Sequence, residues 1–422
     1  MKPLPHFALA SALFLGLCVR AAAQEWTRFR GPNGSGLAVA PKLPAEFSEK
    51  DFNWKIELPG SGHSSPVVWG GRVFVTGNPK DTTTRVIACV SAADGKTLWK
   101  KEYATGGYHL HADNNYAASS PAVDAERVYF HWASPENSGL VALDQADGRE
   151  LWKVDLGPFI SQHGPGTSPI VFEDMVILNF DQDQPKSFLI AVDAKTGKER
   201  WRWEHTGTMH TSSAPCIFTP KGGAPVVVTE SFSVGLTAND ARTGAVAWQL
   251  PGLMKKRCVA SPFVTPAGLI FAQCGEGRAE SFVEAVRPAA DGKSAKLVYE
   301  VVRVGGYVPT PIVVGDLLFL WKENGLVTCM RAAVNEGVIS GDVNTVQLWS
   351  ERVEGPFYGS PVAVNGYLYN MTTRGDLIVL AAAEKFAPPG RIALGEGSHA
   401  TPAVSGGRMY LRTFTHLISV GK

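Results

Sequence analysis

The chain has 422 residues, with 40 Lys and Arg against 39 Asp and Glu, so its formal net charge is +1. Nucleic acids and anionic membrane surfaces are bound through concentrated positive patches, and this balance gives no reason to expect one. We therefore expect no nucleic-acid partner, and ligand specificity must come from side chains such as His, Tyr and Trp. A length above 400 residues is compatible with two or three domains, so internal repeats have to decide the architecture.

The first expected element is an export signal over residues 1–23. An apolar run over residues 7–19 precedes the small residues 21–23, so the mature chain is expected to begin at Gln24 and to be periplasmic or extracellular. Cys18 offers the alternative of a lipid anchor, but Leu17 stands where a lipoprotein motif has a small residue. No later stretch approaches ~20 unbroken apolar residues, so no transmembrane segment is expected.

Residues 24–51 are expected to form an N-terminal arm. The segment Trp26-Thr-Arg-Phe-Arg-Gly-Pro-Asn-Gly-Ser-Gly36 is rich in glycine but lacks the Gly-Lys-Ser/Thr of a phosphate-binding loop. An ordered arm without phosphate chemistry is therefore the interpretation we adopt.

A repeat begins at residue 52 and runs to residue 422. Each unit opens with a small residue followed by Pro, and each contains four short apolar stretches separated by glycine-bearing turns, which is typical of a four-stranded antiparallel propeller blade. The eight Pro residues lie 41 to 55 residues apart, at Pro66, Pro121, Pro169, Pro215, Pro262, Pro311, Pro361 and Pro402. The sequence therefore predicts an all-β fold, an eight-bladed β-propeller in one domain.

A second signature ends most units, with Trp four residues after the Gly of a tight turn. The Gly supplies the positive φ of the turn, and the ring is expected to wedge between neighbouring blades. Tyr299 replaces the Trp in the fifth unit, and Ile392 replaces it in the seventh. The expected docking residues are Trp54, Trp99, Trp152, Trp201, Trp248 and Trp349.

The last unit is too short for four strands. Only 20 residues follow Pro402, whereas Trp54 lies twelve residues before Pro66, just as Trp349 lies twelve before Pro361. Residues 52–58 are therefore expected to supply the missing strand of the last blade. This closure would leave the ring with no open sheet edge.

The pattern Ala-x-Asp-x-x-Thr-Gly-Lys-x-x-Trp, at Ala191 to Trp201, resembles the tryptophan-docking repeat of the PQQ-like (pyrroloquinoline quinone-like) β-propeller superfamily. That superfamily includes quinoprotein alcohol dehydrogenases and the propeller lipoprotein of the outer-membrane β-barrel assembly machinery. The resemblance covers residues 52–422, and it implies an eight-bladed propeller whose function is not fixed by the fold.

The segments that join one blade to the next are expected to meet at the mouth of the central channel. Six of the ten histidines fall in these segments. Imidazole, phenol and guanidinium groups converging on one axis would suit a polar ligand that is neutral or anionic. The candidate ligand-binding residues are His63, His109, His111, His163, His210, Arg257, Tyr307, Tyr358 and His399.

Two narrower hypotheses concern metal and disulfide chemistry. In an extended stretch His109 and His111 would point the same way, and Asp113 could add an oxygen ligand, so these three residues are a candidate metal site beside the alternative of a solvated loop. Cys258 and Cys274 would lie nearly opposite each other in a hairpin, and export would place them in an oxidising compartment, so they are a possible disulfide.

A quinone cofactor is not evident in the sequence. The family's dehydrogenases carry adjacent cysteines joined over the cofactor and a calcium ligand set; this chain has no adjacent cysteines, and residues 113–115 are the nearest approach to such ligands. We therefore expect a monomeric binding or scaffold module of the envelope that uses the channel mouth for a protein, peptide or polysaccharide. The alternative is an oxidoreductase, dependent on PQQ or a divalent metal, that acts on an alcohol or sugar.

Overall fold

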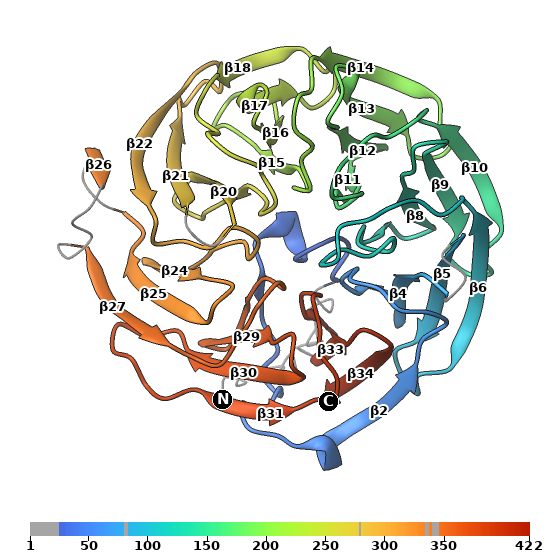
Figure 1. The fold of residues 1–422 in the computed structure, drawn as a ribbon, viewed down its shortest axis with the longest axis vertical. Coiled ribbons are helices and arrows are strands. Elements are labelled where there is room, and N and C mark those ends of the chain that lie inside the picture. The colour runs from blue at the N-terminus through green and yellow to red at the C-terminus, as the bar shows by residue number, and fades with distance from the viewer. Residues whose placement is uncertain (1–24, 80–82, 278–279, 334–336, 340–345) are drawn as a thin grey trace, which may run out of the picture.

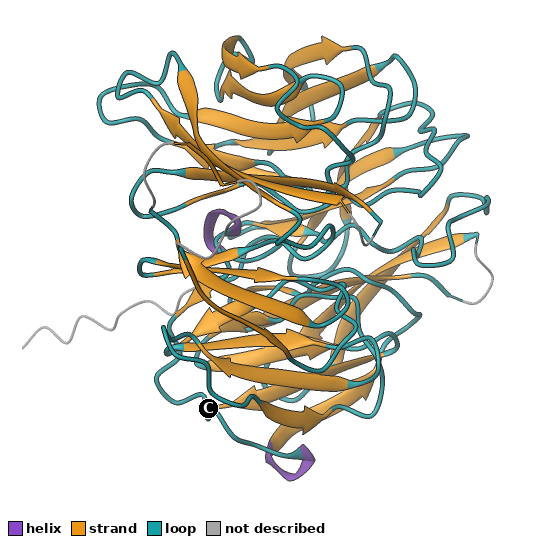
Figure 2. Ribbon diagram, turned by 60° about the vertical axis from the view of Figure 1, so that its left-hand side comes forward, coloured by secondary structure: helices purple, strands orange, loops and turns teal. Residues whose placement is uncertain are grey.

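Eight antiparallel sheets stand around a central axis, and together they form the ring seen in Figure 1. This computed structural model describes residues 25–79, 83–277, 280–333, 337–339 and 346–422. Figure 2 shows that strands dominate and that the two helical segments in the described ranges are short. The prediction of an eight-bladed all-β propeller is confirmed. The expected signal peptide and Cys18 lie outside the described residues.

The first four blades each contain four consecutive strands, numbered from the channel outward. Blade 1 contains β3 (Val67–Trp69), β4 (Arg72–Gly77), β5 (Thr84–Ser91) and β6 (Thr97–Ala104). Blade 2 contains β7 (Ala122–Val123), β8 (Arg127–Trp132), β9 (Gly139–Asp144) and β10 (Glu150–Asp155). Blade 3 contains β11 (Ile170–Phe172), β12 (Met175–Phe180), β13 (Ser187–Asp193) and β14 (Glu199–His205). Blade 4 contains β15 (Cys216–Phe218), β16 (Val226–Ser231), β17 (Gly235–Asp240) and β18 (Val246–Leu250).

Three of the remaining blades borrow a strand or are interrupted. Blade 5 contains β19 (Phe263–Val264), β20 (Ile270–Glu276), β21 (Glu280–Pro288) and β22 (Ala295–Val302), with β26 (Gly337–Ile339) added in parallel at its outer edge. Blade 6 contains β23 (Ile312–Val314), β24 (Leu317–Trp321), β25 (Leu326–Arg331) and β27 (Gln347–Arg352). Blade 7 contains β28 (Val362–Val364), β29 (Tyr367–Met371), β30 (Asp376–Ala381) and β31 (Gly390–Ala393), with β1 (Leu37–Ala38) parallel to its innermost strand.

The N-terminal strand closes the ring, as the sequence predicts. Blade 8 contains β32 (Ala403–Ser405), β33 (Arg408–Arg412), β34 (His416–Gly421) and, outermost, β2 (Phe52–Glu57). β2 pairs with β34 in antiparallel register, with Trp54 opposite Ser419 and Ile56 opposite Leu417. One further backbone hydrogen bond, from the N–H of Leu58 to the carbonyl of Thr415 at 2.8 Å, extends this ladder beyond the strand.

Each docking Trp lies against the turn of the next blade. The indole N–H groups of Trp54, Trp99, Trp152, Trp201 and Trp349 donate to carbonyls in the following blade, those of Ala92, Gln145, Ala194, Ala241 and Ala383, at 3.0 to 3.1 Å. Tyr299 makes the equivalent bond through its hydroxyl to the carbonyl of Ala332, at 2.6 Å. Trp248 is buried too, but its Nε1 has no partner among the described residues.

The turn glycines are required by this docking as well as by their backbone angles. Gly197 has φ of 72°, and a Cβ built on it would lie 2.7 Å from the ring of Trp152. A side chain there would therefore displace the ring as well as strain the turn. The spacing of Gly and Trp in the repeat thus reflects a contact between successive blades.

A ring of hydroxyl groups explains the small residue before each Pro. At each of seven junctions, the hydroxyl of this residue accepts the backbone N–H of its counterpart in the preceding blade, at 2.8 to 3.0 Å. The acceptors are Ser65, Ser120, Ser168, Ser261, Thr310, Ser360 and Thr401. Ala214 interrupts the ring because its side chain has no hydroxyl to offer Ser168. These bonds satisfy buried backbone donors where the innermost strands crowd the axis.

The N-terminal arm crosses the channel and is packed into the ring; Figure 1 shows it in blue at the centre. It includes two short 3₁₀ helices, η1 (Pro32–Gly34) and η2 (Glu49–Asp51). The buried guanidinium groups of Arg28 and Arg30 donate to the carbonyls of Pro215 and Pro311, at 2.5 and 3.0 Å. The arm thereby connects inner strands on different sides of the axis.

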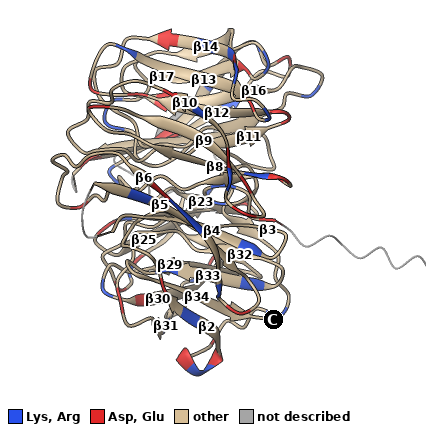
Figure 3. Cartoon of the chain, turned by 90° about the vertical axis from the view of Figure 1, so that its right-hand side faces the viewer, with Lys and Arg blue, Asp and Glu red and all other residues tan. Residues whose placement is uncertain are grey.

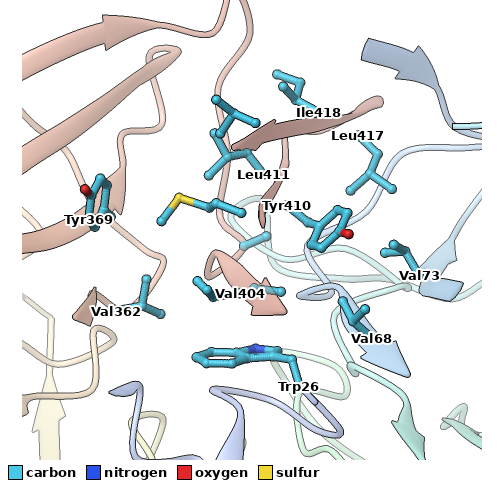
Figure 4. Close-up of a cluster of buried hydrophobic side chains, with 14 of the residues drawn as sticks. Trp26, Val68, Val73, Val362, Tyr369, Val404, Tyr410, Leu411, Leu417 and Ile418 are labelled. Carbon is cyan, nitrogen blue, oxygen red and sulfur yellow. The ribbon is translucent and has the colours of Figure 1, made fainter. Parts of the chain in front are cut away.

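The hydrophobic core is divided among the junctions between blades. The largest cluster joins the arm and blades 7, 8 and 1, and Figure 4 shows Trp26 beneath Val362 and Val404 in it. Trp26 is fully buried and pairs with Val68 through a backbone bridge. Within the described ranges, no helix is long and apolar enough to cross a membrane.

Candidate functional site

The joining segments of all eight blades line one cavity of about 640 Å³ at one end of the channel. We call this cavity the mouth pocket. Phe29 of the arm also lines it, as do six members of the hydroxyl ring. The structure therefore brings together one candidate residue from each junction: His63, His111, His163, His210, Arg257, Tyr307, Tyr358 and His399. His109 is exposed and does not line the pocket.

The imidazole rings follow one another around the pocket. His63 lies 4.2 Å from His399 between ring centroids, and Tyr358 lies 4.5 Å from His399. On the other side, His163 lies 4.9 Å from His111 and 6.2 Å from His210. The pocket wall is therefore a band of aromatic and imidazole rings above the hydroxyl ring.

Burial keeps four of the mouth histidines neutral near pH 7. Desolvation lowers the pKa of His399 to about 4 and that of His210 to about 3, where the charge of Arg257 adds to the effect. It also lowers the pKa of His63 well below the usual value, and that of His163 to a lesser extent. The imidazoles can therefore exchange hydrogen bonds with a ligand but do not contribute positive charge.

Arg257 is already engaged by the protein. Its Nη1 lies 2.7 Å from Nδ1 of His210 and 3.6 Å from Oδ1 of Asp183. Because the guanidinium can only donate, Nδ1 of His210 must accept, which leaves Nε2–H to donate to Ser212 at 3.0 Å. Asp183 thus balances the charge of Arg257 within the protein.

Carboxylates that the sequence analysis missed also line the pocket, namely Glu276 and Glu323. Oε1 of Glu323 accepts the backbone N–H groups of Tyr307 and Val308, at 2.5 and 2.6 Å. Both glutamates lie at turns between the second and third strands of their blades, β20–β21 and β24–β25. Such turns face the mouth in a propeller, and this topological signal could have identified them beside the joining segments.

The longest joining segment folds across the mouth. Nδ2 of Asn114 donates to the carbonyl of His163 at 2.6 Å, and Nδ2 of Asn115 donates to Oγ of Ser61 at 3.3 Å. The hydroxyl of Tyr358 lies 3.4 Å from Oδ2 of Asp113, although 245 positions separate the two residues. This segment therefore narrows the entrance between blades 1, 3 and 7.

The structure brings together two of the three residues suggested for a metal site. Nδ1 of His111 lies 3.8 Å from Oδ2 of Asp113 and both residues line the pocket, whereas His109 does not line it. No group of three or more His, Cys, Asp or Glu side chains in the described ranges could hold a metal ion.

The suggested disulfide is not formed in the structure. The hairpin places Arg257 opposite Gly275, so the register behind the suggestion is as expected, yet Cys258 and Cys274 are both free thiols. Both belong to the apolar cluster between blades 4 and 5. Burial raises the pKa of each thiol, which is the environment of a small hydrophobic residue.

Buried titratable groups near the mouth should make stability depend on pH in two opposing senses. His131 is 1% exposed, and burial lowers its pKa to about 4. The contribution of the neutral imidazole to folding stability is therefore present above pH 6.5 and is lost as the pH falls toward 4. Asp181 is equally buried and its pKa is raised to about 7, so its contribution is present below pH 4 and is lost as the pH rises through 7.

His131→Asn should therefore reduce the acid sensitivity of the protein. At pH 5 the unfolded chain binds a proton that the native imidazole does not, which costs about 2 kcal/mol of stability. Urea unfolding should show the variant less stable than the wild type at pH 7.5, with the deficit reduced by about 2 kcal/mol at pH 5. The exposed His109, changed to Asn, is the matched control. A deficit that is the same at both pH values would contradict this assignment.

Comparison with known proteins places the chain among propellers of two kinds. The family model described as outer membrane protein assembly factor BamB matches residues 46–134 and 83–338, more than half of the chain. A polyvinylalcohol dehydrogenase from Pseudomonas sp. is 27% identical over 200 residues, which cover 44% of this chain and 28% of the relative. A tetrathionate hydrolase from Acidithiobacillus ferrooxidans is 24% identical over 285 residues, or 63% of this chain and 50% of the relative. The chain thus spans half or less of the length of these relatives.

Solved structures give the same fold. The quinohemoprotein alcohol dehydrogenase from Comamonas testosteroni has a TM-score of 0.67 at 13% identity, over 94% of this chain and 80% of that chain. BamB from Moraxella catarrhalis has a TM-score of 0.60 at 14% identity, over 87% of this chain and 96% of that chain. At these identities the likeness concerns the fold alone.

Proposed function

This chain belongs to the PQQ-like propeller family described as outer membrane protein assembly factor BamB, and on that premise we propose that it is a binding module. Its mouth pocket would hold a segment of a protein partner, and the rest of the ring would serve as a rigid frame. The observation that carries the proposal is the convergence of all eight joining segments on one cavity of about 640 Å³. We further propose that the protein acts after export, in the periplasm or outside the cell.

The rim of the pocket suits a protein partner. Ile160, in the segment that joins blades 2 and 3, is 39% exposed, and Phe232, in the turn between β16 and β17 of blade 4, is 38% exposed. Exposed apolar and aromatic side chains beside polar groups are typical of the centres of protein interfaces. In the side view of Figure 3, charged residues of both signs are mixed over the blades.

The pocket lining does not fit a PQQ cofactor. PQQ carries three carboxylates, whereas the lining supplies the carboxylates of Asp113, Glu276 and Glu323 and a single cation, Arg257. Because Asp183 already balances Arg257, three ligand carboxylates would face like charges without compensation. The described residues also contain no group of three or more His, Cys, Asp or Glu side chains that could hold a metal ion beside the quinone. We therefore place the oxidoreductase activity second.

Site-specific photo-crosslinking can test the proposal. A benzoylphenylalanine placed at Tyr358 should cross-link to one protein of defined mass in an envelope extract. The same group placed at Tyr367, which is 39% exposed on β29, should give no such product. Equal products from both positions, or none from either, would contradict docking at the mouth. Reduction of a redox dye with an alcohol, after loading with PQQ and calcium in equal stoichiometry, would favour the oxidoreductase.

A further inference from the structure

The charged side chains that line the mouth pocket are mostly carboxylates. Asp113, Glu276 and Glu323 line it together with one guanidinium, that of Arg257. Asp183, 3.6 Å from Arg257, offsets that positive charge. Lys256 lies nearby, but Glu276 and Glu280 hold its ammonium at 2.7 and 2.9 Å. Within the lining, carboxylates therefore outnumber cationic side chains, and the one guanidinium there is already balanced.

Glu323 provides a second and more specific observation. The residue is 9% exposed, so it is about nine-tenths buried, and it lines the pocket. Two backbone N–H groups bind Oε1, while Oε2 has no hydrogen-bond or ion-pair partner in the described part of the chain. Oε2 is not an enclosed atom, so it is open to the pocket and a ligand can reach it.

The groups beside Glu323 suit an organic cation. Tyr307 and Val308 follow one another along the joining segment that binds Oε1, and both line the same part of the pocket. A Cβ built on Gly275 would lie 3.2 Å from Cδ2 of Tyr307, so one edge of the ring is packed against that glycine. A carboxylate attracts an ammonium or guanidinium group through its charge, and an aromatic ring beside it attracts the same group through its face.

We infer that the mouth pocket selects a basic side chain, a lysine or arginine of the docked segment, whose cation binds Oε2 of Glu323 beside the ring of Tyr307. This inference rests on the proposed function and names the chemistry of the ligand. It also reverses the expectation, drawn from the sequence, of a neutral or anionic ligand. The expectation is reversed because it was drawn from the joining segments alone, and Glu276 and Glu323 lie outside those segments.

Three peptides that differ at one position can test the inference. They are acetylated and amidated Gly-Ser-Xaa-Ser-Gly with Lys, Gln or Glu as the central residue, titrated into the full chain by calorimetry in low salt. We expect the Lys peptide to bind at least tenfold more tightly than the Glu peptide, with the Gln peptide between them. The preference should shrink at high salt, since screening weakens interactions between charges.

Glu323→Gln should weaken the binding of the Lys peptide about tenfold, which removes the preference for Lys. The affinity for the Gln peptide should stay unchanged. The amide oxygen of the substituted side chain can still accept both N–H groups, so the fold should persist, and an unchanged melting temperature checks this. Glu276→Gln is a second variant, expected to act more weakly because Lys256 already pairs with that carboxylate. Glu351→Gln, on the exposed outer strand β27, is the matched control.

The possible results separate the two proposals. Equal affinities for the three peptides, all lost in a Tyr358→Ala variant, would overturn the charge selection and leave docking at the mouth intact. Tighter binding of the Glu peptide would also overturn the charge selection. Failure of all three peptides to bind the wild type would remove both the docking of a polypeptide and the inference built on it.

Discussion

Replacing Trp201 by Ala should lower the free energy of unfolding by about 3 to 5 kcal/mol, the usual cost of removing a buried aromatic side chain. The ring is 7% exposed, lies over Gly244 of the next blade and donates its N–H to the carbonyl of Ala241 at 3.1 Å. The variant loses the packing between blades 3 and 4 and leaves a buried carbonyl without its donor. Urea unfolding followed by fluorescence or circular dichroism would measure the loss.

A pair of Phe variants separates packing from hydrogen bonding. Trp201→Phe keeps most of the ring but loses the N–H bond, so it should cost about 1 kcal/mol more than Trp248→Phe, whose indole N–H has no partner among the described residues. The two positions are equivalent in successive blades, so each serves as the control for the other. A loss below ~1 kcal/mol for Trp201→Ala would mean that the ring does not hold the blades together.

Much of the architecture can be predicted because a propeller repeats its local rules. The Gly-to-Trp spacing recurs because every blade needs the same turn and the same contact with its neighbour, as Gly197 and Trp152 illustrate. Ring closure follows from counting strands and from the phase of Trp54, and the pairing of β2 with β34 confirms it. Even the degenerate fifth blade keeps the contact, since Tyr299 replaces the indole bond with a hydroxyl bond.

The candidate site can be predicted only where it follows the repeat. Eight of the nine proposed mouth residues converge because each belongs to a joining segment, whose position the repeat defines. Glu276 and Glu323 were missed because they come from turns between the second and third strands of their blades, which face the mouth but lie outside the joining segments. Phe29 was missed because it comes from the arm, where nothing in the local sequence indicates which part of the ring it contacts. The balancing partner of Arg257 could not be predicted either, because Asp183 lies in the turn between β12 and β13 of blade 3.

Removing β2 should have the largest effect of all, because it opens the ring. A chain that lacks the residues before Pro59 loses the ladder along β34, including the pairs Trp54 with Ser419 and Ile56 with Leu417. It also loses the bond from Trp54 to Ala92 that joins blade 8 to blade 1. The exposed edge of β34 then becomes a template for pairing with other chains, so we expect aggregation in place of a monomer.

Because the same deletion removes the arm, a peptide added back is needed to assign the effect to the strand. A synthetic peptide of residues 48–58 should pair with β34, restore its edge and return part of the truncated chain to the monomeric state in light scattering. The same peptide with Trp54→Ala should rescue less well, since it can form the ladder but cannot dock on blade 1. A truncated chain that stays monomeric with an unchanged melting temperature would show that β2 is dispensable for closure. Rescue by both peptides to the same extent would show that the ladder alone closes the ring.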